Sequence, residues 1–296
     1  MAFDHASAPT TPHPFTRTLI GLGALATGIL LAYIWSYELV DKVVADHVAR
    51  LVLHEGLATY QISSIGTGLL FAFVSGVAGT LTACNVCVLA TAVPLTPQTG
   101  GPAPAVRSLL PFIGSLLIVA CGYGIVGVLL GANFPQLSSQ TLGNMPMRLM
   151  QAGFVFVCLG LLLVGWGVAV LRNSGEQAGA WHLTSSNKVQ IALGVVVAAF
   201  QIGRPFPPFR KMFEDAIARG DALYGAAAFG LQALGNVALV LLLVLLLSSW
   251  RNGAILTRIG EHPGTRATLI SIGFLIGGAF MVSYWGVRVP AIFLVR

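Results

Sequence analysis

The sequence predicts an all-α integral membrane protein with about seven transmembrane helices. Of its 296 residues, 56% are hydrophobic and only 9% are charged, whereas ordinary soluble domains carry about 25% charged residues. The apolar residues also form long uninterrupted runs, while the strands of a membrane β-barrel would alternate apolar and polar positions. Both observations favour helices that span a bilayer and exclude a separate water-soluble body.

Seven apolar runs are candidate spans, and most of them reach the roughly 20 residues that a spanning helix needs. They cover residues 17–37, 61–93, 108–131, 149–171, 188–204, 222–250 and 267–290. Residues 1–16 contain three prolines and are predicted to be a disordered tail, not a cleavable signal peptide. The expected organisation is this tail, an extra helix with a surface segment over 17–60, and a six-helix membrane domain over 61–296.

Two charged segments between the spans are predicted to be amphipathic helices on the membrane surface. In the first, Glu38 to Tyr60, polar residues recur every four positions opposite a row of valines, and Gly56 is expected to end the helix. These polar residues are Lys42, Asp46, Arg50 and His54. The second runs from Phe209 to Arg219, after two prolines and before Gly220.

The chain is basic, with 16 Lys and Arg against 10 Asp and Glu. These basic residues are scattered, mostly at span ends, which is typical of topology signals and headgroup contacts and not of a nucleic-acid partner. The 251–266 loop carries three arginines, while the 38–60 segment is net acidic. Placing the basic loop inside predicts a cytoplasmic N-terminus in a bacterial cytoplasmic membrane.

The chain also shows a weak internal repeat. Spans two to four and spans five to seven each begin with an apolar helix that small residues or prolines interrupt, near Cys84 in one unit and at Gly203–Pro205 in the other. Units with an odd number of spans are inverted, and such repeats place their functional site at the paired helix breaks. We therefore expect the two breaks to approach each other. Small-residue pairs such as Gly76/Gly79 and Gly273/Gly277 predict helix-packing seams.

Two stretches, GVAGTLTACNVCVLATAVP (76–94) and GVVVAAFQIGRPFPPF (194–209), resemble the first helices of the two inverted three-helix units in CcdA/DsbD-type transmembrane thiol reductants, the cytochrome c biogenesis family. The resemblance covers about residues 61–290. It implies electron transfer by thiol–disulfide exchange from a cytoplasmic thioredoxin to thioredoxin-fold acceptors outside, a thiol:disulfide oxidoreductase activity with no cofactor. In the family each unit supplies one cysteine. Here Cys84 matches the first, but Phe206 stands at the second position, so that disulfide cannot form.

Cys84 and Cys87 are therefore the predicted catalytic pair. Cysteines three residues apart face the same side of a helix, and such a pair can shuttle electrons or bind a soft metal ion. The alternative is that both are small apolar residues suited to tight packing. We interpret Cys121 and Cys158 as packing residues of this kind.

Arg204 is the predicted centre of a partner- or substrate-binding site. An arginine inside hydrocarbon costs roughly 2.5–3.5 kcal/mol on insertion scales, so it should face a cavity or an interface. Nearby prolines remove backbone donors and leave carbonyls free. The predicted binding residues are Arg204, Pro205, Phe206 and Pro208. In the alternative interpretation, Arg204 reaches out to the headgroups from a span end.

Two other functions remain open on the same framework. One is a transporter that moves a soft metal ion or small solute past the cysteines and Arg204. The other is a non-catalytic subunit that docks into a larger membrane complex through its surface helices. His47 and His54 lie seven residues apart on one helix face. We interpret them as a solvated face, and no resident metal is predicted.

Overall fold

The computed structural model describes residues 14–36, 43, 45–80, 102–134, 140–142, 145–173, 187–202, 206–250 and 263–294. Within these residues the chain is mostly helical, with an irregular segment over 54–64, a 3-10 turn η3 (Gly131–Asn133), a π-helical turn η5 (Tyr284–Arg288) and a two-residue antiparallel pair of strands, β1 (Thr141–Leu142) and β2 (Met145–Pro146). The helices are α1 (Pro14–Ile34), α2 (Ala45–Leu53), α3 (Ile65–Thr80), α6 (Pro102–Leu130), α7 (Met147–Asn173), α9 (Asn187–Ile202), α10 (Pro207–Arg219), α11 (Ala222–Ser249), α13 (Pro263–Ser283) and α14 (Val289–Leu294).

Five of these helices, α1, α6, α7, α11 and α13 with its continuation, are long and apolar enough to cross a membrane. The pair α9 and α10 makes a sixth if its two helices count as one bent span. The prediction of a helical integral membrane protein is thus confirmed, with five or six spans among the described residues where seven were expected. The difference lies in α3, whose 16 described residues cover about 24 Å, less than the roughly 30 Å of a bilayer core.

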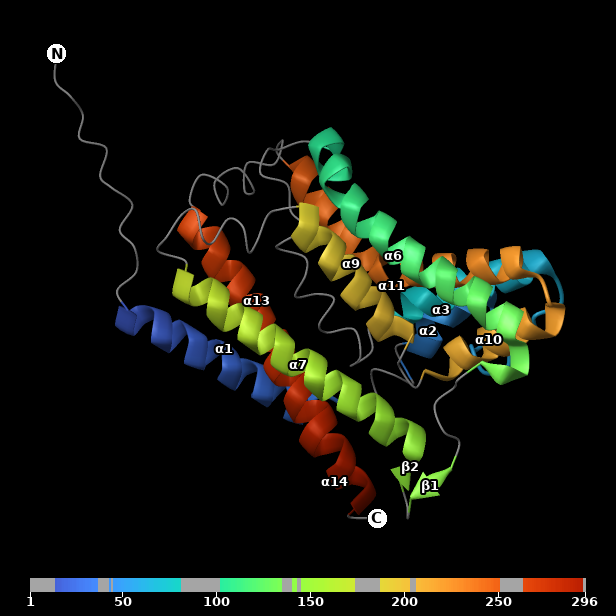
Figure 1. The fold of residues 1–296 in the computed structure, drawn as a ribbon, viewed down its shortest axis with the longest axis horizontal. Helices are drawn as coiled ribbons and strands as arrows, with labels where there is room; N and C mark the ends of the chain where they lie inside the picture. Colours follow the sequence, from blue (N-terminus) through green and yellow to red (C-terminus); the bar gives the residue numbers. More distant parts are fainter. Residues whose placement is uncertain are drawn as a thin grey trace.

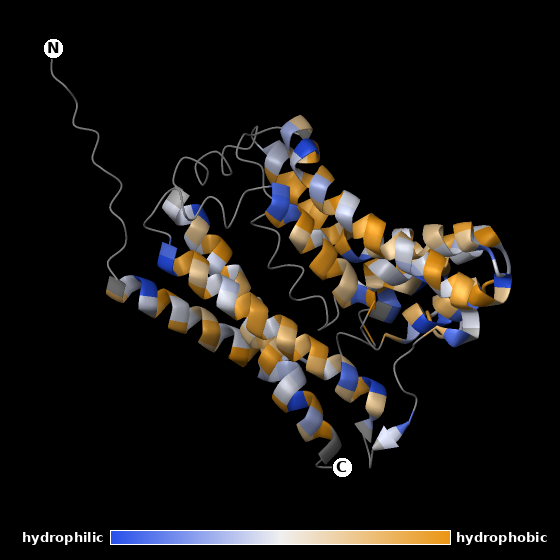
Figure 2. Cartoon of the chain, in the orientation of Figure 1, coloured by the Kyte–Doolittle hydropathy of each residue, from blue (hydrophilic) through white to orange (hydrophobic). Residues whose placement is uncertain are grey.

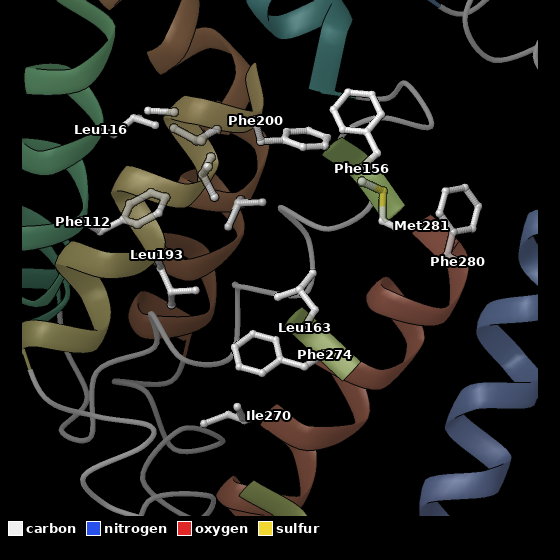
Figure 3. Packing of buried hydrophobic residues seen from close by; sticks show 14 of the residues in the cluster. Phe112, Leu116, Phe156, Leu163, Leu193, Phe200, Ile270, Phe274, Phe280 and Met281 are labelled. Carbon is white, nitrogen blue, oxygen red and sulfur yellow. The ribbon is translucent and has the colours of Figure 1, made fainter. Parts of the chain in front are cut away.

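The described helices form two groups (Figure 1). One group packs α7 and α1 against α13, and the other packs α3 and α6 against α11, with α9 on α6. The rings of Phe156 (α7) and Phe200 (α9) bring the groups together, with centroids 4.7 Å apart, and the buried cluster of Figure 3 draws on both. Hydrophobic residues dominate the helices of both groups, as expected for lipid contact (Figure 2).

The backbones of α7 and α13 touch at glycine. A Cβ added at Gly160 would lie 2.9 Å from the carbonyl oxygen of Gly278, and one added at Gly278 would lie 2.6 Å from the carbonyl oxygen of Gly160. On one side of this point Ser271 donates a 2.7 Å hydrogen bond to the carbonyl of Gly167, and on the other Gly153 faces Trp285. The two helices are therefore antiparallel and packed face to face at Gly278, one residue beyond the predicted Gly273/Gly277 pair.

Two shorter helices, α3 and α9, are seated on long helices by the same kind of contact. A Cβ at Gly76 would overlap the carbonyl oxygen of Gln232 and lie 3.0 Å from the nitrogen of Asn236, both in α11. This confirms the predicted seam at Gly76. In α9, a Cβ at Gly194 would overlap the carbonyl oxygen of Phe112 and lie 3.2 Å from the nitrogen of Leu116, both in α6.

The extra N-terminal helix α1 lies on α13. Gly28 approaches the carbonyl oxygen of Ile276, and no side chain larger than hydrogen would fit there. The Arg288 guanidinium donates to the carbonyl oxygen of Ala32 at 3.0 Å, which satisfies one of the last-turn carbonyls that a helix leaves without internal partners. These contacts fix both the middle and the end of α1.

The two amphipathic helices occur where the sequence predicts them, with changes of boundary: α10 begins at Pro207, two residues before the predicted Phe209, and α2 ends earlier than predicted. α10 begins with two prolines after Phe206 and ends at Gly220, whose φ of +66° is the left-handed conformation that glycine adopts easily. Its axis lies 86° from that of α9. α2 ends at Leu53, earlier than the predicted Gly56, because His54 already takes φ +61°. Residues 38–42 lie outside the described part.

The seam between α7 and α13 gives a first test. In Gly278→Ile the new side chain would collide with the backbone of Gly160 and with Val164, so we expect a loss of about 1–3 kcal/mol of stability and a lower Tm in detergent. The control is Gly165→Ile in α7, where no atom lies within 4 Å of the added Cβ. Equal losses of Tm in the two variants would contradict this packing.

Candidate functional site

Four predicted site residues, Cys84, Cys87, Arg204 and Pro205, lie outside the described residues, while Phe206 and Pro208 lie within them. The described residues that adjoin these positions define the surroundings of the candidate site. These are Thr80, four residues before Cys84, and the residues on either side of Gly203–Pro205.

The flank on α3 lies against the middle of α11. The Thr80 hydroxyl lies 3.0 Å from the carbonyl oxygens of both Gly235 and Asn236, and 3.3 Å from the carbonyl oxygen of Gly76 in its own helix. α11 runs from Ala222 to Ser249, so the acceptors at Gly235 and Asn236 are near its midpoint.

The second flank reaches the same part of the bundle. Ile202 ends the described part of α9 and Phe206 precedes α10, and both pack against one buried hydrophobic cluster. α3 contributes four residues to that cluster, namely Phe71, Ala72, Val74 and Ala78. The described residues next to both predicted helix breaks are thus brought to one cluster, although the breaks themselves are not described.

Aromatic rings hold α10 on this cluster. Phe209 and Phe213 lie on its buried face, and their ring centroids are 5.2 and 5.8 Å from that of Phe229 in α11. Tyr123 of α6 completes the group, with its centroid 5.8 Å from Phe213. Pro208 is buried in the first turn of α10, so its visible contribution is to start and anchor this helix.

Lys211 ties α10 to the segment after α2. Its ammonium group donates to three backbone carbonyls, those of Leu57 at 3.4 Å, Ala58 at 3.0 Å and Tyr60 at 2.5 Å. It also lies 5.5 Å from the centre of the Phe71 ring. From the sequence alone, Lys211 was predicted only to lie in the amphipathic helix over Phe209–Arg219. Its true partners are backbone oxygens about 150 residues away, which no local pattern could indicate.

A second polar group joins α10 to α11. Asp215 accepts a hydrogen bond from Arg219 at 3.0 Å and from the Tyr224 hydroxyl at 2.5 Å. The hydrogen bond to Asp215 raises the pKa of the Arg219 guanidinium. The Tyr224 hydroxyl occupies the space beside Gly68 in which a Cβ would lie. α10 is therefore held by side-chain contacts to α11 and by carbonyl contacts to the α2–α3 segment.

The remaining candidates separate by position. Cys121 turns toward α11, where its Sγ lies 2.8 Å from a Cβ built at Gly230, and Cys158 is exposed on α7. Both are free thiols, as a packing role would allow. His47 is exposed on α2, and no group of three potential metal ligands occurs among the residues that the structure describes.

No protein-family model, curated protein or solved structure matches this chain. Its function is therefore inferred from its own residues.

The Lys211 contacts generate a second prediction. Lys211→Met keeps the length of the side chain but removes all three donors, leaving carbonyls without that partner, so we expect a loss of about 1–3 kcal/mol. Faster protease cleavage between α2 and α3 in nanodiscs would reveal it. Arg210→Met is the matched control, because Arg210 is exposed and, within the described part of the chain, its side chain pairs with Glu214 on the same helix. Unchanged cleavage in Lys211→Met would contradict the anchoring role.

Proposed function

We propose that this membrane protein carries electrons across a bacterial cytoplasmic membrane by thiol–disulfide exchange, with Cys84 and Cys87 as its redox pair. The electron donor is a cytoplasmic thioredoxin and the acceptors are thioredoxin-fold proteins outside, as in cytochrome c biogenesis. The observation that carries the proposal is the docking of Thr80, four residues before Cys84, at the middle of α11. A carrier that serves both sides needs its reactive group near that depth.

The architecture we propose is a six-helix domain of two inverted units, α3–α6–α7 and α9–α11–α13, plus α1. Paired contacts support it. α3 sits on α11 through Gly76 as α9 sits on α6 through Gly194, in each case over a carbonyl oxygen and the nitrogen four residues later. The separation along the sequence between Gly160 and Gly278 equals that between Gly76 and Gly194. Gly160 and Gly278 also face each other in the structure. A two-fold axis would produce this pattern.

The proposed reaction balances within one dithiol pair. A thioredoxin thiolate attacks the Cys84–Cys87 disulfide, and a mixed disulfide forms while the other cysteine leaves as a thiolate and takes up a proton. The second thioredoxin thiol then displaces the bound cysteine, so that thioredoxin is oxidised and the pair is reduced by two electrons. The reverse steps reduce an acceptor disulfide outside. A vicinal pair resolves its own mixed disulfide. A cysteine is therefore not required at position 206, where this chain has phenylalanine.

A transporter of a small solute on the same framework is the second candidate. Buried polar side chains where α3 packs against the middle of α11 favour it, because polar groups at membrane depth usually serve a pathway or a partner. Those that are buried there are Ser75, Thr80, Gln232 and Asn236.

The thiol proposal predicts a trapped intermediate. A thioredoxin variant with only its attacking cysteine, activated as a mixed disulfide with thionitrobenzoate, should form a mixed disulfide with Cys84→Ser or with Cys87→Ser as thionitrobenzoate leaves, but not with the double variant. Non-reducing gels of the full chain in nanodiscs would detect the adduct. Cys158→Ser is the control, because its thiol is exposed on α7 and its loss should change nothing. An adduct that depends on Cys158 would contradict the assignment.

Arg204 generates the next prediction, since a fixed positive charge beside a proline-rich break suits an anionic group or a partner's backbone. Arg204→Ala should lower the rate of exchange with thioredoxin at least tenfold while the amount of inserted protein stays the same. Arg210→Ala removes a nearby but ion-paired and exposed arginine and should leave the rate unchanged. Wild-type rates in Arg204→Ala would indicate an arginine that only reaches the headgroups.

A further inference from the structure

Buried polar groups follow the seam between α6 and α9, which run side by side (Figure 1). Gly194 marks the face of α9 that touches α6. Gln190 lies four residues before it and Gln201 seven residues after it, so both lie on that same face. Their exposed fractions are 7% and 2%. From the α6 side, the buried hydroxyl of Ser115 lies directly against Gly194.

Gln201 has no hydrogen-bond partner among the described residues, at either its side-chain oxygen or its side-chain nitrogen. The side-chain oxygen of Gln190 is also buried without a hydrogen-bond partner among the described residues. Buried polar atoms are nearly always hydrogen-bonded, because leaving them unpaired in a nonpolar interior destabilises the fold. The Gln201 amide therefore offers one acceptor and two donors that the described bundle does not use.

At the seam between α3 and α11 the buried glutamine, Gln232, lies on the long helix α11 and not on the short helix α3. Gly76 makes the same backbone approach there as Gly194 makes to α6. Ala72 lies four residues before Gly76 and is buried. The equivalent position in α9, four residues before Gly194, is Gln190. Seven residues after Gly76 the sequence has Ala83, where α9 has Gln201. Alanine suits a close seam, so the glutamines of α9 call for another explanation.

We propose that the α6–α9 seam is a binding site for an amide-type compound, with Gln201 as its recognition residue. A primary amide or lactam presents one donor and one acceptor side by side, and so forms two parallel hydrogen bonds with the Gln201 side chain. The ligand is uncharged, because the buried polar residues that the structure describes on α6 and α9 are Ser115, Gln190 and Gln201, none of them charged. This site is separate from the proposed thiol pair and does not depend on it.

The test uses the full chain in nanodiscs and propionamide, which reproduces the functional group of glutamine itself. N,N-dimethylpropionamide is the matched compound, because it keeps the carbonyl but has no N–H donor. We expect propionamide to raise the Tm of the wild-type protein saturably and the dimethyl compound to leave it unraised. Gln201→Met, which keeps the side-chain length, should have a higher Tm without ligand and no response to propionamide.

Gln232→Met is the control variant and should keep the response, because Gln232 is a buried glutamine of α11, outside the proposed α6–α9 site. Gln201→Leu provides a second apolar variant if Gln201→Met does not fold. The proposal is overturned if propionamide acts equally on wild type and Gln201→Met, if it acts on neither, or if both apolar variants of Gln201 are less stable than wild type. The last result would mean that the amide is already satisfied within the protein.

Discussion

Backbone contact at glycine determines how the long helices of this protein are placed. Lipid is as apolar as leucine, so the hydrophobic effect does not hold spanning helices together, and association depends on close packing and on hydrogen bonds. Gly160 and Gly278 let α7 and α13 touch, while Gly76 and Gly194 seat α3 on α11 and α9 on α6. Once these seams are set, the Thr80 hydroxyl reaches the α11 carbonyls and Phe200 meets Phe156.

The glycine seams also decide where polar chemistry can occur. A helix that is docked tightly over its length satisfies its own backbone, so free polar groups are tolerated at depth only where protein or water covers them. Ala78 in α3 and Ile202 at the described end of α9 both belong to or pack against one hydrophobic cluster. α10 lies across this region and is fastened by Lys211 and Asp215. A partner that approaches from this end of the bundle would therefore meet a fixed helix and not a loose loop.

Local features were predictable from the sequence, and contacts between distant segments were not. The position of α10 followed from the two prolines at its start and from Gly220 after it, because both act within a turn of the chain. α2 ended before Gly56 because His54 itself takes the left-handed conformation, which composition does not indicate. Periodicity suggested a small-residue seam in α13 but not that Gly278 would face Gly160, since the choice of face depends on the partner helix.

In the candidate site, too, local features could be predicted from the sequence and contacts between distant segments could not. Cysteine spacing and the proline cluster indicated where chemistry belongs, whereas the docking of Thr80 and the unpaired amide of Gln201 appear only once helices from both halves of the chain are in place.

Thiol state is the most direct measure of the central claim. In a Cys121→Ser/Cys158→Ser background, alkylated thiols would be counted by mass spectrometry across a series of redox buffers. The account predicts that both remaining thiols disappear together, as one two-electron couple. Two thiols that stay alkylatable in every buffer would contradict it.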